Sequence, residues 1–61
     1  MPVIHFYGPR MPKEKKEALV KEFAQAASRA TGIPVEKMIT LLHETEPENI
    51  GLGDDLLANR R

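Results

Sequence analysis

The residue with the most distinctive chemistry is Pro2, directly behind Met1. If Met1 is removed, Pro2 presents a free secondary amine, which acts as a general base at neutral pH once its pKa is lowered. If Met1 stays, the same nitrogen is a tertiary amide without basicity. A small second residue, proline included, generally permits removal of the methionine. Pro2 is therefore a candidate general base whose chemistry depends on processing.

The only two histidines, His5 and His43, fall in different predicted strands. The chain has no cysteine and no carboxylate at a matching spacing, so this pair is a weak signal for a metal site. We expect no bound metal and interpret each histidine first as a packed or edge residue.

Three glutamates, Glu44, Glu46 and Glu48, surround a proline. We expect them to be solvated, because so short a chain offers no cleft in which paired carboxylates could act. Gly51-Leu52-Gly53 follows a loop and opens no long helix, so it does not indicate a dinucleotide cofactor. We interpret it as part of a turn that clasps a neighbouring subunit.

Two segments, Pro2–Tyr7 and Met38–Glu44, have the composition of strands. Side chains alternate between the faces of a strand. One face of the first strand carries Val3, His5 and Tyr7, and one face of the second carries Ile39, Leu41 and His43. All faces hold bulky groups, which predicts a sheet covered on both sides.

The segment Lys13–Thr31 contains neither glycine nor proline and predicts a helix, with Pro12 at its first position and Gly32 as the left-handed residue after it. Apolar residues recur at three- and four-residue steps; this predicted stripe comprises Leu19, Phe23, Ala26, Ala27 and Ala30. The order strand, helix, strand predicts an α/β fold: a β-α-β unit with parallel strands and a crossover helix.

The rest of the chain is predicted to be short connections. Residues 34–37 suit one helical turn, residues 45–49 a loop, and residues 50–53 a hairpin or clasp. Asp54–Arg61 is predicted to form a last helical turn.

With 61 residues, the chain is one small domain, residues 1–61. One helix covers only one face of a two-stranded sheet, and two strands alone are marginally stable. Since there is no cysteine for a disulfide, association of several copies is the remaining common remedy. We therefore expect a homo-oligomer.

Charge and hydropathy exclude other partners. Nine basic and nine acidic residues balance, whereas nucleic-acid binders usually carry a basic excess. No apolar run reaches the length of a membrane span, and no signal peptide is evident. A cytoplasmic location is the default expectation.

Several segments occur together in a familiar order. They are Pro2-Val3-Ile4-His5, the Tyr7-Gly8-Pro9 turn, Ser28-Arg29 near the helix end, the Ile33-Pro34 turn and the Asn49–Gly53 clasp. Over essentially the whole chain, this arrangement resembles the 4-oxalocrotonate tautomerase family. The resemblance implies a tautomerase-like β-α-β protomer that pairs into dimers with a four-stranded sheet, three dimers forming a hexamer.

The resemblance also implies a reaction. Pro2, freed of Met1, would move a proton between oxygen and carbon of a 2-hydroxy-dienoate such as 2-hydroxymuconate, without cofactor or metal. Arg10 matches, within one residue, the family arginine that binds a substrate carboxylate. A second family arginine falls on Ile39, and an aromatic residue before the Gly-x-Gly falls on Ile50. Ile39 and Ile50 are therefore expected to line a more aliphatic pocket with one cation fewer.

The residues leave open which group replaces the missing cation, which reaction the amine catalyses, and whether the protein is an enzyme. His43 shares a strand face with Ile39, and we hypothesise that His43, or a residue from a neighbouring subunit, supplies the missing polar contact to the substrate. Other reactions of the proline amine, such as dehalogenation, hydration or imine formation, fit the same residues. The alternative in a different class is a non-catalytic oligomeric scaffold or small-acid-binding protein that retains the fold.

Overall fold

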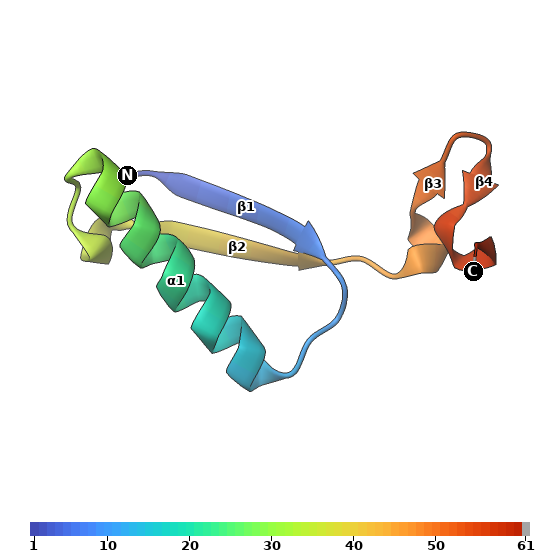
Figure 1. Ribbon diagram of the computed structural model, residues 1–61, viewed down its shortest axis with the longest axis horizontal. Coiled ribbons are helices and arrows are strands. Elements are labelled where there is room, and N and C mark those ends of the chain that lie inside the picture. The colour runs from blue at the N-terminus through green and yellow to red at the C-terminus, as the bar shows by residue number, and fades with distance from the viewer. Residues whose placement is uncertain (61) are drawn as a thin grey trace.

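The computed structural model describes residues 1–60 and has the predicted order of elements (Figure 1). Strand β1 (Val3–Gly8), helix α1 (Lys13–Thr31) and strand β2 (Ile39–Glu44) form a β-α-β unit. The strands are parallel, and each β1 residue pairs with the residue 36 positions later, from Val3 opposite Ile39 to Gly8 opposite Glu44. The predicted α/β class and parallel pairing are confirmed.

Both strands start one residue later than predicted. Pro2 precedes β1 but takes part in the ladder through its carbonyl oxygen, which accepts a hydrogen bond from the Ile39 amide at 3.0 Å. Met38 is not in a strand, because it ends a 3₁₀ turn (Val35–Lys37): its amide donates to the Val35 carbonyl. This turn is the short helical segment predicted for residues 34–37.

Helix α1 begins after Pro12, which has an extended conformation (ψ 155°) and caps the helix from outside instead of occupying its first position. At the other end Gly32 has φ 79°, the left-handed conformation predicted for it, and its amide donates to the Ser28 carbonyl at 2.8 Å. The Ser28 hydroxyl donates to the Ile33 carbonyl at 2.6 Å. Together these bonds reverse the chain toward β2.

The helix covers one face of the sheet, where Phe23 meets Phe6 with ring centroids 5.7 Å apart. Of the predicted stripe, Leu19, Phe23 and Ala27 are half-buried, but Ala26 and Ala30 are exposed. The prediction was wrong for these two alanines because apolarity alone does not determine how the helix is rotated about its axis. The half-buried side of the helix includes residues 24 and 28 instead.

Residues 1–60 leave the opposite face of the sheet uncovered. Its side chains are Val3, His5 and Tyr7 of β1 and Ile39, Leu41 and His43 of β2, and we call this set the open face. No residue among 1–60 is fully buried, and the protomer exposes 4980 Å². A compact monomer of this mass exposes about 4,000 Å². The excess, about 1,000 Å², is comparable to one partner's share of a stable interface.

After β2 the chain forms a 3₁₀ turn (Pro47–Asn49) and a hairpin of β3 (Gly51–Leu52) and β4 (Asp55–Leu56). The predicted hairpin is confirmed, whereas its role as a subunit clasp stays a prediction. Gly53 in the two-residue loop has φ 67°, which favours glycine. The helical turn predicted for Asp54–Arg61 is limited to a 3₁₀ turn over Leu57–Asn59, because Asp55 and Leu56 pair as a strand instead. Arg61 lies outside the described residues.

The hairpin extends away from the β-α-β unit, beyond the carboxyl ends of both strands (Figure 1). The protomer accordingly measures 42 × 24 × 16 Å, with a radius of gyration of 14.7 Å. A compact domain of this length has about 10–11 Å. Within residues 1–60, no helix has the length and apolar character needed to traverse a lipid bilayer.

Candidate active site

Pro2 lies at the amino end of β1, half-buried beside Ile39 of the neighbouring strand. Met1 precedes it and is exposed, so the Pro2 nitrogen in this structure is an amide. Ile39 is 38% exposed and Val3 lies opposite it in the register, so the nearest strand neighbours of Pro2 on the open face are apolar. Removal of Met1 would leave the amine next to aliphatic side chains.

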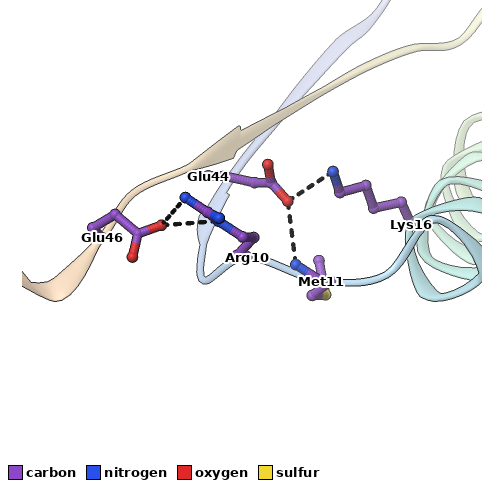
Figure 2. A network of polar contacts seen from close by, with 5 residues as sticks. All are labelled: Arg10, Met11, Lys16, Glu44 and Glu46. Atoms are coloured by element: carbon purple, nitrogen blue, oxygen red, sulfur yellow. Dashed lines mark hydrogen bonds and ion pairs between the residues drawn. The ribbon is translucent and has the colours of Figure 1, made fainter.

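Arg10 lies just beyond the other end of β1, where it meets Glu46 beyond the end of β2 (Figure 2). One oxygen of Glu46, Oε2, accepts from Arg10 Nε at 3.1 Å and lies 3.0 Å from Nη2. The Arg10 side chain is 78% exposed, so this ion pair contributes little to stability. It does determine which edge of the guanidinium is occupied. Glu46 binds the Nε–Nη2 edge, and the Nη1–Nη2 edge faces away from Glu46.

Glu44 forms a second link between the same two chain segments (Figure 2). Its Oε2 lies 2.7 Å from Lys16 Nζ on α1 and accepts a hydrogen bond from the Met11 amide at 3.2 Å. The hydrogen bonds from Lys16 and from the Met11 backbone lower the pKa of the Glu44 carboxyl below its ordinary value of 4.5. Glu44 thereby holds the loop between β1 and α1 against the end of β2.

The histidines predicted to be packed or edge residues contact each other on the open face. His5 Nδ1 and His43 Nε2 are 2.9 Å apart, so one ring donates and the other accepts. The His43 ring also lies nearly parallel to that of Tyr7, with centroids 4.3 Å apart. Residues 1–60 contain no group of three or more side chains of the kinds that bind metals.

The protomer does not bring the predicted site residues together. Pro2 and Ile39 are at the amino end of the sheet, whereas Arg10 is beyond its carboxyl end, across the six residues of β1. At about 3.3 Å per residue, this separation is about 20 Å. His43 is four residues along β2 from Ile39, and Ile50 lies beyond that strand, before the hairpin.

At the Arg10 end there is an open hollow of about 420 Å³. Arg10, Glu46, Pro47, Glu48 and Ala58 line it. The glutamates were expected to be solvated, and the pairing of Glu46 with Arg10 and of Glu44 with Lys16 was not predicted. The pairing follows from the strand register, which no local sequence pattern indicates: the offset of 36 residues that pairs Gly8 with Glu44 also sets Arg10 opposite Glu46.

The family model described as "Tautomerase enzyme" matches residues 2–60. The chain belongs to the tautomerase family. Among solved structures, DmpI from Archaeoglobus fulgidus is similar over 95% of this chain and 100% of its own, with 33% identity and a TM-score of 0.87. No protein with a curated description matches.

Two further solved structures agree with this assignment. A 4-oxalocrotonate tautomerase homologue is 29% identical, with coverage of 100% of this chain and 98% of that one and a TM-score of 0.85. TomN, a 4-oxalocrotonate tautomerase homologue of the tomaymycin biosynthetic pathway, is 28% identical over 97% of this chain and 92% of its own, with a TM-score of 0.90. The resemblance stated from the sequence, to the 4-oxalocrotonate tautomerases, is confirmed.

For this member of the tautomerase family we predict that Glu44 makes folding stability sensitive to acid. Because its pKa is lower in the folded than in the unfolded chain, its contribution is fully present above about pH 4.5 and is lost as the pH falls through the folded pKa. In urea unfolding at fixed protein concentration, Glu44→Gln should therefore be less stable than wild type at pH 6, with the difference shrinking by pH 3.5.

The matched control is Glu22→Gln, at an exposed position of α1. It should follow the wild-type pH dependence. An equal loss of stability on acidification in wild type and Glu44→Gln would contradict the role assigned to Glu44.

Proposed function

We propose that this protein, after removal of Met1, is a cofactor-independent tautomerase that converts the enol form of a 2-hydroxy-dienoate to its conjugated ketone. The match of residues 2–60 to the tautomerase family carries the proposal. Pro2 is the general base, and Arg10 binds the substrate carboxylate. Ile39 and Ile50 supply apolar contacts.

In the proposed reaction, the Pro2 amine accepts the proton of the 2-hydroxyl group and returns a proton to a carbon of the dienol. The electron pair of the enol shifts to form the carbonyl group, so no atom is gained or lost. Such a base works best with a pKa near the ambient pH. Apolar neighbours such as Ile39 disfavour the charged ammonium form and lower the amine's pKa toward that range.

The proposed site requires more than one copy of the chain. Since Pro2 and Arg10 lie at opposite ends of β1, Arg10 must reach the Pro2 of another protomer. Three observations support association: the open face, the exposed area of 4980 Å² and the projecting hairpin. We propose the hexamer implied by the family resemblance, a trimer of dimers, and retain the expectation of a cytoplasmic location.

The first prediction from the proposed function concerns assembly. Leu41, in the middle of the open face, is 43% exposed in the protomer, and Leu41→Lys would place a charge in the proposed interface. Sedimentation velocity should show smaller species for this variant than for wild type. Val20→Lys, on α1 at a residue 36% exposed, is the matched control and should sediment as wild type. A wild-type chain that is a stable monomer would refute the composite site.

The second prediction concerns the base. Pro2→Ala should reduce kcat/KM for a 2-hydroxy-dienoate by about 100-fold or more, the usual contribution of general acid–base catalysis. Intact mass spectrometry must first establish that both proteins lack Met1, because only then is the position 2 nitrogen an amine. Wild-type protein that retains Met1 should be as inactive as the variant. Equal rates in processed wild type and processed Pro2→Ala would exclude Pro2 as the base.

The third prediction concerns His43. If its imidazole supplies a polar contact to the substrate in the assembled protein, His43→Ala should raise KM about fivefold or more, the value of one hydrogen bond. Tyr7→Phe, which keeps the ring that stacks on His43, controls for changes in the open face. An unchanged KM in His43→Ala would remove this residue from the site.

One observation favours the alternative, a scaffold or small-acid-binding protein without catalysis. Carboxylate binding at the Nη1–Nη2 edge of Arg10 needs no free Pro2 amine and so does not depend on removal of Met1. Retention of Met1 in protein isolated from its natural cell would favour this function over the enzymatic one.

A further inference from the structure

The charges around Arg10 limit what this residue can bind. Glu46 Oε2 occupies the Nε–Nη2 edge of the guanidinium, at 3.1 and 3.0 Å. A carboxylate can still bind in the bidentate manner at the Nη1–Nη2 edge. The hollow beside it is lined by one cation, Arg10, and two carboxylates, Glu46 and Glu48. The summed charge of these three side chains is therefore already negative before any ligand enters, which disfavours a second carboxylate on a ligand that Arg10 binds through its first.

The surroundings of Pro2 provide no compensating charge from the paired strand. Ile39 donates its backbone amide to the Pro2 carbonyl, and its side chain is exposed on the open face together with Val3. A carboxylate placed against these aliphatic side chains would lose hydration without gaining a partner. An alkyl or aryl group placed there would instead bury apolar surface.

We infer that this protein selects substrates with a single carboxylate and an apolar opposite end, and discriminates against dicarboxylates. Ile39 is the specificity-determining residue at the Pro2 end, and Glu46 restricts Arg10 to one carboxylate at the other. This inference rests on the proposed function, because it assumes that one substrate spans Pro2 and the Arg10 of another copy.

The sharpest test compares two substrates that differ only at the far end. These are 2-hydroxyhexa-2,4-dienoate, which ends in a methyl group, and 2-hydroxymuconate, which ends in a carboxylate. For the processed wild-type assembly, kcat/KM should be about tenfold or more higher for the monocarboxylate, the value of one unpaired charged group. Equal or faster turnover of 2-hydroxymuconate would overturn the inference.

Variants separate the two ends of the site. Ile39→Arg offers a cation to the second carboxylate and should lower the monocarboxylate-to-dicarboxylate ratio about tenfold or more. Ile39→Leu keeps the position apolar and should leave the ratio unchanged. Glu46→Gln should lower KM for both substrates about two- to threefold, because a negative charge near the bound carboxylate is removed. A ratio that is the same in wild type and in a correctly assembled Ile39→Arg would also overturn the inference.

A binding measurement distinguishes failure of the inference from failure of the proposed function. If neither dienoate is turned over, the enzymatic function fails, but hexanoate and adipate, six-carbon mono- and dicarboxylates, can still be titrated while the Arg10 Nε–H signal is followed by NMR. Tighter binding of hexanoate supports the inferred selectivity without catalysis. Equal or tighter binding of adipate refutes the inferred selectivity. If Ile39→Arg does not assemble, this comparison in the wild-type protein is the deciding test.

Discussion

The parallel pairing of β1 with β2 at a constant offset of 36 residues determines which side chains lie together at each end and on each face of the sheet. It sets Pro2 beside Ile39 at one end of the sheet, and it brings Glu44 to the other end and Glu46 just beyond it. The crossover helix can cover only one face of these two strands. The same pairing therefore leaves the other face, with its two histidines and Tyr7, uncovered by the helix.

The polar links at the carboxyl ends of the strands act on the loop that connects β1 with α1. Glu44 binds Met11 and Lys16, while Glu46 binds Arg10, so both acids of β2 and its extension hold this loop at successive positions. Exposed ion pairs contribute little free energy. Their value is geometric, since they orient Arg10 at the edge of the hollow and leave one edge of its guanidinium for a ligand.

Much of this fold could be predicted from the sequence because local signals agree with one another. The run without breakers from Lys13 to Thr31, with Gly32 after it, defined the helix, and the two bulky segments defined the strands. The rotation of the helix could not be predicted, since Ala26 and Ala30 are apolar but small enough to be exposed at little cost. Nor could the pairing of Arg10 with Glu46, because it depends on a register that no local pattern contains. The roles of Pro2, Arg10, Ile39, His43 and Ile50 stay predictions, because they depend on how several copies meet.

Dividing a site between protomers would tie its chemistry to assembly. The isolated protomer exposes about 1,000 Å² more than a compact chain of its mass, and in the proposed oligomer the contacts between copies would compensate for the missing core. Under the proposed function, the same contacts enclose the amine of Pro2 and bring Arg10 of another copy toward it. Enclosure by apolar side chains lowers the amine's pKa, and the approach of a fixed guanidinium acts in the same direction. A protomer too small to bury its own catalytic amine would thus gain both a stable fold and a lowered amine pKa when its open face associates with another copy.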